Sequence, residues 1–237
     1  MATASPAVTP RSISRKMTRS LSPLFTVLPM PRALRIVFSL LLFMGLGSAV
    51  SAAFGKTVLV YGDSLSAAYG MPQHRGWVAL LEERLKRERP DYSVVNASIS
   101  GETTAGGLAR IGKALEREKP AIVILELGAN DGLRGLPVAA MKQNLGAIIE
   151  QSKKKGAKVL LVGMRLPPNY GEQYTRAYER AFAELAKSHR AAFLPFLLEG
   201  IGDKGELFQP DRIHPTETAQ PAVLKNVWGA LAPLLKK

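Results

Sequence analysis

The stretch VYGDSLSAAY, residues 60–69, contains a serine that closely follows a run of apolar, largely β-branched residues. Glycine, aspartate and serine are all common turn formers, so Gly62-Asp63-Ser64 alone is also consistent with an ordinary turn. A serine hydroxyl becomes a nucleophile when a base removes its proton and a third group orients that base. The chemistry open to Ser64 therefore depends on which bases, carboxylates and hydrogen-bond donors the rest of the chain supplies.

The best base for Ser64 is a histidine near the C-terminus. Of the three histidines, His74 follows a loop and His189 ends a predicted helix, and both are better explained as surface residues. In DRIHP, Asp211 precedes His214 by three residues, a spacing that puts both side chains on one face of a helical turn. A carboxylate there can accept the imidazole N–H and fix its tautomer. The alternative is an acidic helix cap beside an unrelated histidine.

Two further residues have the properties of oxyanion-hole donors. Gly101, in SISGET, has no side chain, so a ligand can approach its backbone N–H closely. Asn130, in GANDG, offers a neutral side-chain donor, and the backbone N–H of Ser64 would complete the set. Ordinary turn chemistry is the alternative for Gly101 and Asn130. Asp63 and Asp131 are equally well explained as turn or cap residues, and we assign them no proton-transfer role.

These residues must be positioned by the elements between them, and the apolar periodicity predicts alternating strands and helices. The predicted strands are 56–61, 92–98, 121–127, 157–164 and 191–196. The predicted helices are 77–88, 103–119, 137–156, 172–189 and 216–235, the last with a kink at Pro221. Five strands, each followed by a helix, indicate an α/β fold with a five-stranded parallel sheet covered on both faces.

Chemistry in such sheets lies beyond the carboxyl ends of the strands. The segments expected there are rich in glycine and polar residues: GDSLS, NASISGET, LGANDGLRG, MRLPPNYG and a long segment ending in DRIHPTE. Each candidate residue named above falls in one of them. The order Ser, Asp, His also occurs in α/β-hydrolases, but the fifth position of their G-x-S-x-G motif is Ser66 here, so that pattern fails.

Together these motifs resemble the GDSL, or SGNH, hydrolase family, and look closest to its bacterial multifunctional thioesterase I/arylesterase/lysophospholipase group. The resemblance covers residues 56–235 and includes VVNASISGET, ELGANDGLRG and RLPPNYG. The four blocks that carry it, in the family's order, are Gly62-Asp63-Ser64-Leu65-Ser66, Gly101, Gly128-x-Asn130-Asp131 and Asp211-x-x-His214. One departure is Ala129, where relatives of this group often have glycine.

The resemblance implies a flavodoxin-like three-layer α/β/α sandwich and a serine esterase that works through an acyl-enzyme intermediate. It implies that Ser64 is the nucleophile, His214 the base and then the acid, and Asp211 the group that orients His214. It implies an oxyanion hole made by the N–H groups of Ser64 and Gly101 and by the Asn130 side chain. It also implies that no metal or cofactor is needed, in agreement with the absence of a His-x-x-x-His pair from the sequence.

Composition excludes several other classes of function. The 237 residues include no cysteine, which excludes disulfides, thiolate catalysis and cysteine-based zinc sites. The formal charge of +13 invites a nucleic-acid partner, but six of the basic residues stand in the acid-free segment 1–53, and the others are interleaved with acids. No G-x-G-x-x-G follows the first predicted strand, and no P-loop motif occurs. We therefore expect no nucleic-acid partner, no metal and no cofactor.

Residues 30–53 have the pattern of a signal peptide. Arg32 and Arg35 precede an uncharged apolar core, and small residues suit cleavage after Ala52 or Ala53. An uncleaved anchor is the alternative. The pattern predicts a secreted or periplasmic protein.

Residues 1–29 form a basic, Ser/Thr/Pro-rich extension ahead of that signal, with the composition of a transit peptide. Because a complete signal begins at Met30, we favour Met30 over Met1 as the initiator. A single hydrolase domain is then expected at 54–237, which is long enough to fold without disulfides.

Two loops at the active edge, 133–137 and 164–168, are candidates for an acyl-chain site, with plain surface loops as the alternative. The side chains expected to contact substrate are Leu133, Arg134, Leu136, Leu166 and Pro167. Arg134 and Arg165 would attract an anionic head group. Export favours acyl esters such as lysophospholipids over cytoplasmic acyl-CoA. We also expect a monomer in transient contact with a membrane surface.

Two other functions remain as alternatives on the same fold. One is a carbohydrate O-deacetylase, which would use the same residues on a shorter acyl group. The other is a lipid- or carbohydrate-binding module without activity, which the intact Ser64, Asp211 and His214 disfavour. The sequence leaves acyl-chain length, head group and oligomeric state open.

Overall fold

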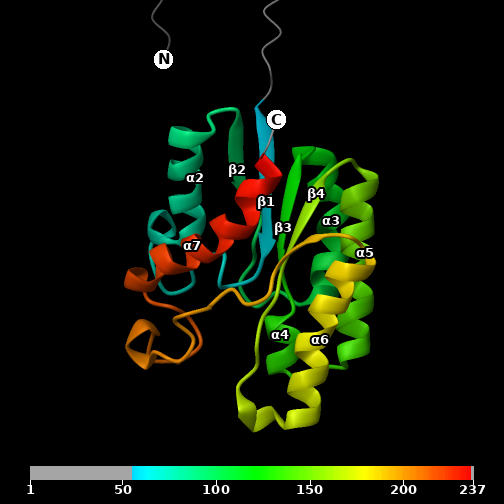
Figure 1. Cartoon of the computed structure of the whole chain (residues 1–237), viewed down its shortest axis with the longest axis vertical. Coiled ribbons are helices and arrows are strands. Elements are labelled where there is room, and N and C mark those ends of the chain that lie inside the picture. Colours follow the sequence, from blue (N-terminus) through cyan, green and yellow to red (C-terminus); the bar gives the residue numbers. More distant parts are fainter. Residues whose placement is uncertain (1–54, 236–237) are drawn as a thin grey trace, which may run out of the picture. The chain divides into compact units, whose positions relative to one another are not determined.

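Runs of valine, isoleucine and leucine form one sheet of five parallel strands in the computed structural model, which describes residues 55–235 (Figure 1). The predicted extension 1–29 and signal peptide 30–53 lie outside the described residues. The strands are β1 (Lys56–Gly62), β2 (Tyr92–Asn96), β3 (Ile122–Glu126), β4 (Lys158–Val162) and β5 (Ala192–Leu194). All five residues of β3 are buried, as expected for a strand with helices on both faces.

Helices cover both faces of the sheet. On one face, α2 (Trp77–Glu88) packs against α7 (Gln220–Leu231). On the other, α5 (Val138–Lys154) packs between α3 (Thr104–Glu118) and α6 (Glu172–Ser188). The predicted α/β fold with a five-stranded parallel sheet flanked by helices is confirmed. None of the helices described within 55–235 has the length and apolar character needed to cross a bilayer.

Six shorter helices complete the part of the chain that the structure describes, residues 55–235. They are η1 (Gln73–Arg75), α4 (Ala129–Leu133), η2 (Pro168–Tyr170), η3 (Gly205–Leu207), η4 (Glu217–Ala219) and η5 (Ala232–Leu235). The single helix predicted over 216–235 is wrong, because η4, α7 and η5 divide that range between them. Pro221 lies in the first turn of α7, next to the junction with η4, where its missing N–H breaks no hydrogen bond of the helix.

The order of the strands, β2-β1-β3-β4-β5, determines where a ligand can bind. The chain leaves β1 toward β2 on one side and returns to β3 on the other side of β1. In parallel sheets this reversal opens a crevice beyond the carboxyl ends of the two central strands. The loops that follow β1, β2 and β3 therefore meet at one edge of the sheet, and these loops carry Ser64, Gly101 and Asn130.

Candidate active site

Ser64 lies in the turn that begins as β1 ends. We call residues 63–69 the Ser64 turn. The carbonyl of Asp63 accepts the N–H of Ala67 at 2.9 Å, and the Asp63 side chain accepts the N–H of Leu65 at 3.1 Å. These bonds reverse the chain directly after the strand, so the partly buried Ser64 lies at the carboxyl edge of the sheet.

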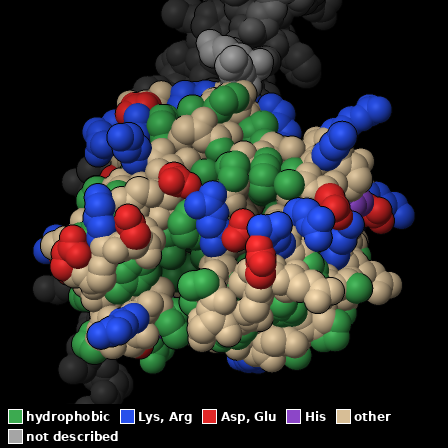
Figure 2. Space-filling view, turned by 60° about the horizontal axis from the view of Figure 1, so that its bottom comes forward, with side chains coloured by type: hydrophobic (Ala, Val, Ile, Leu, Met, Phe, Trp, Pro, Cys, Tyr) green, Lys and Arg blue, Asp and Glu red, His purple; other side chains and the backbone are tan. Residues whose placement is uncertain are grey.

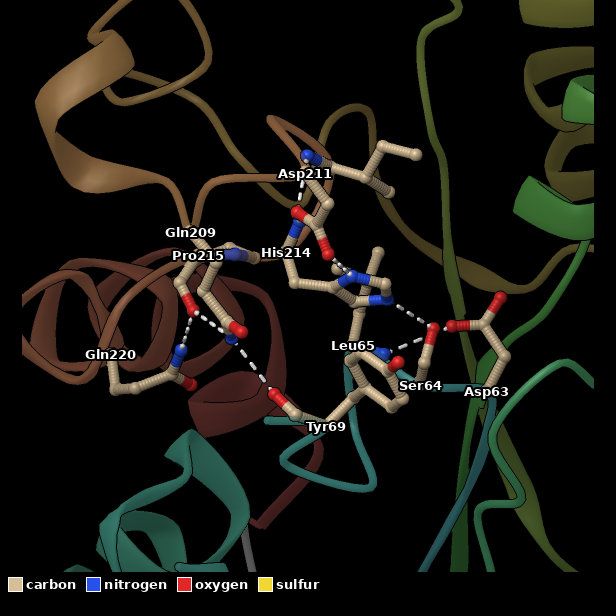
Figure 3. A network of polar contacts seen from close by, with 10 residues as sticks. Asp63, Ser64, Leu65, Tyr69, Gln209, Asp211, His214, Pro215 and Gln220 are labelled. Carbon is tan, nitrogen blue, oxygen red and sulfur yellow. Dashed lines mark hydrogen bonds and ion pairs between the residues drawn. The ribbon is translucent and has the colours of Figure 1, made fainter. Parts of the chain in front are cut away.

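A chain of hydrogen bonds joins Ser64, His214 and Asp211, which are contributed by opposite ends of the described sequence (Figure 3). His214 Nδ1 lies 2.7 Å from Asp211 Oδ2, and His214 Nε2 lies 2.9 Å from Ser64 Oγ. With Nδ1–H donating to the carboxylate, Nε2 is free to accept the hydroxyl proton of Ser64. This is the arrangement that a serine nucleophile, a base and an orienting carboxylate require.

Asp211 is held in a tight turn, not in the predicted helical turn. Its Oδ1 accepts the N–H groups of Ile213 at 2.9 Å and of His214 at 3.0 Å, and Arg212 between them is left-handed with φ of 56°. Burial alone would raise the pKa of Asp211, but the His214 ring and these two N–H groups outweigh it and lower the pKa to about 2. Asp211 is therefore ionised at neutral pH.

Gln209 joins the segment that carries His214 to the Ser64 turn (Figure 3). Its Nε2 donates to the carbonyl of Tyr69 at 2.8 Å and to that of Pro215 at 3.3 Å, while its backbone N–H donates to the carbonyl of His214 at 2.8 Å. The ring of Tyr69 also stacks on His214, with centroids 4.4 Å apart. These contacts fix the base relative to the serine.

Three hydrogen-bond donors are available at the same edge. Within residues 55–235, the backbone N–H groups of Ser64 and Gly101 have no protein acceptor. Gly101 adopts a φ of +79°, a conformation that favours glycine. Asn130, in α4, uses one of its two amide hydrogens to bond Asp63 Oδ2 at 3.1 Å, which leaves the other for a ligand.

The two aspartates of these motifs have structural partners. Asp131 is buried and accepts the backbone N–H of Thr104 at 2.9 Å and its hydroxyl at 2.5 Å, so it anchors the start of α3. Asp63 is fully buried, and burial raises its pKa to about 6, although the N–H of Leu65 and the Asn130 amide oppose the shift. Asp63 thus orients the Asn130 amide, and neither aspartate touches the open side of the site.

A cavity of about 730 Å³ adjoins this site, a volume typical of small-ligand pockets. Its wall is mainly apolar and includes Leu65, Ala129, Leu133, Met164, Leu166, Pro167, Phe196, Leu198, Phe208 and Ile213. Leu65 follows Ser64 and Ile213 precedes His214, so the cavity reaches the hydrogen-bonded chain. Arg165 lies at the wall, with its guanidinium 4.7 Å from the centre of the Phe196 ring and 3.6 Å from the Glu199 carboxylate.

Of the five residues predicted to contact substrate, the structure places Leu133, Leu166 and Pro167 in the cavity wall. The other two lie outside this wall. Arg134 reaches back to the carbonyl of Gly101, with Nη2 at 3.0 Å, and Leu136 is an exposed side chain outside the cavity lining. No group of three or more His, Asp or Glu side chains that could hold a metal ion occurs among residues 55–235.

The sequence of residues 60–220 matches the GDSL-like lipase/acylhydrolase family. The chain belongs to this family. The resemblance inferred from the sequence motifs is therefore confirmed, and the hydrolase acts on carboxylic esters.

Curated relatives cover nearly the whole described domain of the hydrolase. It is 52% identical to the esterase TesA of Pseudomonas aeruginosa over 183 residues, which are 77% of this chain and 91% of the relative. It is 41% identical to an arylesterase of Vibrio mimicus, covering 81% of this chain and 94% of the relative. It is also 41% identical to thioesterase 1/protease 1/lysophospholipase L1 of Escherichia coli K12, covering 78% and 87% of the two chains.

Solved structures share the fold of the hydrolase. A crystal structure of TesA, 52% identical, superposes with a TM-score of 0.74 over 76% of this chain and 99% of that chain. The esterase EstA from a Pseudoalteromonas species, in a structure inhibited by monoethylphosphonate, is 40% identical and superposes with a TM-score of 0.73 over 77% of this chain and all of that chain.

Sequence reasoning missed part of the hydrolase site. Phe196, Phe208 and Ile213 line the cavity. Phe196 was predicted only as the end of a strand, and Phe208 and Ile213 stand in a segment without a regular apolar pattern. Only the fold brings the three side chains to the loops after β3 and β4. Glu126, the last residue of β3, lies beneath the Ser64 turn and reads in the sequence as part of a buried strand. The one available signal for Glu126 in the sequence was its charge, because it directly follows the apolar run AIVIL.

Proposed function

We propose that the hydrolase cleaves acyl esters in two steps through an acyl group on Ser64. The observation that carries this proposal is the chain of hydrogen bonds from Asp211 through His214 to Ser64, with distances of 2.7 and 2.9 Å. In this proposal His214 is the base and then the acid, and Asp211 holds its ring.

In the first step, Ser64 Oγ attacks the carbonyl carbon of the ester while His214 Nε2 takes the hydroxyl proton. The tetrahedral intermediate collapses when His214 gives this proton to the leaving alcohol oxygen, or to the sulfur of a thioester. The acyl group stays on Ser64 and the alcohol or thiol departs. Ionised Asp211 stabilises the imidazolium that exists between the two proton transfers.

In the second step, water replaces the alcohol. His214 removes a proton from the water as it attacks the acyl carbonyl, and then returns the proton to Ser64 Oγ, so that a carboxylic acid leaves and the serine is regenerated. In both steps negative charge develops on the carbonyl oxygen. The N–H groups of Ser64 and Gly101 and the second amide hydrogen of Asn130 are the donors that we assign to this charge.

The cavity suggests the class of substrate. An apolar wall around about 730 Å³ suits an acyl chain of several carbons, because each buried methylene contributes roughly 0.8 kcal/mol. The names of the relatives, which include arylesterase, thioesterase and lysophospholipase, are compatible with such substrates. A carbohydrate O-deacetylase would need room for a methyl group only, so the cavity favours longer acyl esters, lysophospholipids among them.

A role for Arg134 and Arg165 in binding an anionic head group has less support than the acyl site. Both guanidinium groups already have protein partners, the Gly101 carbonyl for Arg134 and Glu199 for Arg165. On the face that contains the carboxyl edge of the sheet, basic and acidic side chains are interspersed (Figure 2). Glutamine at both positions should weaken hydrolysis of anionic lipids more than that of neutral aryl esters, and an equal loss on both would refute the role.

The proposal includes export of the hydrolase, which rests on the signal-peptide pattern of residues 30–53. The mass of the protein released from the periplasm should correspond to a chain that begins at Ala53 or Phe54. A chain that retains Met30 and stays in the cytoplasm would contradict it. A peptide spanning residues 20–35 in the unprocessed protein would show that translation starts upstream of Met30.

Hydrolysis of p-nitrophenyl esters from acetyl to palmitoyl by the purified protein and by its Ser64→Ala variant tests the function. We expect kcat/KM to rise as the acyl chain grows from acetyl and then to level off, and we expect Ser64→Ala to abolish the activity. A preference for acetate alone would favour the deacetylase. Activity that survives Ser64→Ala would show that Ser64 is only a turn residue.

A further inference from the structure

Glu126 is a buried carboxyl group that the mechanism above does not use. It ends β3, is 2% exposed, and pairs across the sheet with Gly62 at the end of β1. Its Oε2 accepts the hydroxyl of Ser66 at 2.6 Å and the backbone N–H of Asp63 at 3.3 Å. One carboxyl oxygen therefore bonds the chain on both sides of Ser64.

We propose that Glu126 is a positioning residue for ester hydrolysis, which holds the Ser64 turn from beneath through Asp63 and Ser66 and so sets the place of the Ser64 hydroxyl. This inference rests on the proposed role of Ser64 as nucleophile. Glu126 does not reach the reacting atoms, and acts through the backbone that carries them.

Ser66 is held at a second point as well. Its backbone carbonyl accepts the Nδ2 of Asn96, at the end of β2, at 2.8 Å. Ser66 is 2% exposed, so its hydroxyl has no water to replace Glu126 as a partner. The bonds from Asn96 in β2 and Glu126 in β3 thus fix Ser66 within the Ser64 turn. Loss of either bond leaves a buried polar group of Ser66 unsatisfied.

The effect of Glu126 extends to the proposed oxyanion hole. The backbone N–H of Asp63 bonds Glu126, while the side chain of the same residue bonds the Asn130 amide at 3.1 Å. A shift of Asp63 would therefore move both the serine and an oxyanion donor. A displacement of about 1 Å of such groups can lower the rate about 100-fold without weakening the binding of substrate.

The space beside Gly62 explains why the strand ends in glycine. A Cβ at this position would lie 2.5 Å from Glu126 Oε2 and 2.8 Å from Ser66 Oγ. The Glu126 and Ser66 side chains occupy the volume that any larger residue would need. The glycine of the GDS motif therefore makes room for the bond that we propose to position the serine.

Glutamine is the natural replacement for Glu126. Burial and the neighbouring Asp63 carboxylate raise the pKa of Glu126 well above its usual range, and the bonds from Ser66 and Asp63 only partly oppose this. A glutamine has the same shape, and its amide oxygen can accept the same two bonds. If Glu126 only positions the Ser64 turn, glutamine can replace it, because glutamine accepts the same bonds. If Glu126 transferred a proton, glutamine could not replace it.

The test compares kcat, KM and thermal midpoint for Glu126→Ala, Glu126→Gln and Ser66→Ala on one p-nitrophenyl ester. We expect Glu126→Ala to lower kcat about 100-fold with little change in KM. We expect Glu126→Gln to keep most of the wild-type kcat, and Ser66→Ala to lose an intermediate amount. The double variant Ser66→Ala/Glu126→Ala should be no slower than Glu126→Ala, because the two losses share one bond.

Two buried residues outside the site supply matched controls. Ser152→Ala removes a hydroxyl that is 0% exposed and bonds only the carbonyl of Ile148 in its own helix, at 2.8 Å. Leu85→Ala truncates a side chain that is 0% exposed in α2. Both variants should lower the thermal midpoint and leave kcat unchanged. They therefore distinguish an effect of lower fold stability from an effect of a displaced Ser64.

The outcomes distinguish this inference from the proposed function. An inactive Ser64→Ala with a wild-type kcat in Glu126→Ala overturns the role of Glu126 alone. Activity in Ser64→Ala overturns the proposed function, and this inference with it. If Glu126→Ala does not fold, the other two variants decide. A wild-type kcat in Ser66→Ala, or a Glu126→Gln variant with less than about a tenth of the wild-type kcat, overturns the inference.

Discussion

Replacing Asn130 with alanine should slow the reaction without weakening substrate binding. One amide hydrogen of Asn130 bonds Asp63 Oδ2 at 3.1 Å, and the other is one of three donors assigned to the oxyanion. Loss of a single such donor costs about 10²- to 10³-fold in kcat, or about 2.7–4 kcal/mol of transition-state stabilisation. KM should change little, because the ground-state carbonyl uses the donor less than the oxyanion does.

The same substitution should also lower the stability of the fold. Asp63 is fully buried, and the Asn130 amide is one of the groups that lower its pKa. Removal of this donor leaves a buried carboxyl oxygen without a partner, at a cost of about 1–3 kcal/mol. For a domain of this size the thermal midpoint should fall by about 2–12 °C.

Steady-state kinetics on p-nitrophenyl butyrate, below the thermal midpoint of every variant, measures the effect. Asn144→Ala is the matched control, because Asn144 Nδ2 bonds Thr104 Oγ1 at 3.1 Å and touches none of the three donors. This control should lose stability and keep its kcat. A wild-type kcat in Asn130→Ala, or a loss that appears in KM alone, would refute the assignment of Asn130 to the oxyanion.

Three further predictions follow from single contacts. Gly62→Ala should lower both the thermal midpoint and kcat, since the new Cβ would meet Glu126 Oε2 at 2.5 Å. An unchanged thermal midpoint and an unchanged kcat in an esterase assay would contradict this close contact. Gln209→Leu should lower kcat about tenfold, because it removes the bond that joins the segment carrying His214 to Tyr69 in the Ser64 turn. A lower thermal midpoint with an unchanged kcat would argue that this bond does not position His214. Asp211→Asn should lower kcat by up to about 10⁴-fold. Because the folded pKa of Asp211, about 2, is below its ordinary value of 3.8, ionised Asp211 stabilises the fold above about pH 4, and this contribution is lost as the pH falls toward 2. Urea denaturation across this range should show a smaller pH dependence in Asp211→Asn than in the wild type, and parallel curves would count against a stabilising role of ionised Asp211.

The residues with reactive side chains could be predicted because the sequence offers few of them. With three histidines and no cysteine, His214 had little competition as a base, and the predicted parallel sheet placed it at the same edge as Ser64. The spacing of Asp211 and His214 was interpreted correctly as bringing the two side chains together. The local conformation was not, because the left-handed Arg212 turns the chain where a helix would continue.

Other features depend on contacts that no local pattern records. The helix α4 has only five residues, three of them Asn, Asp and Gly, so it shows no apolar period and was predicted as a loop. The partners of Glu126 lie 60 and 63 residues away along the chain, and its carboxyl group becomes meaningful only when β1 and β3 pair. The cavity likewise combines residues from the segments that follow β1, β3, β4 and β5.

The central claim is that the hydroxyl of Ser64 is the nucleophile. The most direct test is to inactivate the purified protein with diethyl p-nitrophenyl phosphate and to locate the label by intact mass and peptide mapping. We expect one diethylphosphoryl group per chain, on Ser64, with activity lost in proportion to labelling and no labelling of Ser64→Ala. Complete inactivation with the label on another residue, or an unlabelled protein that remains active, would contradict the claim.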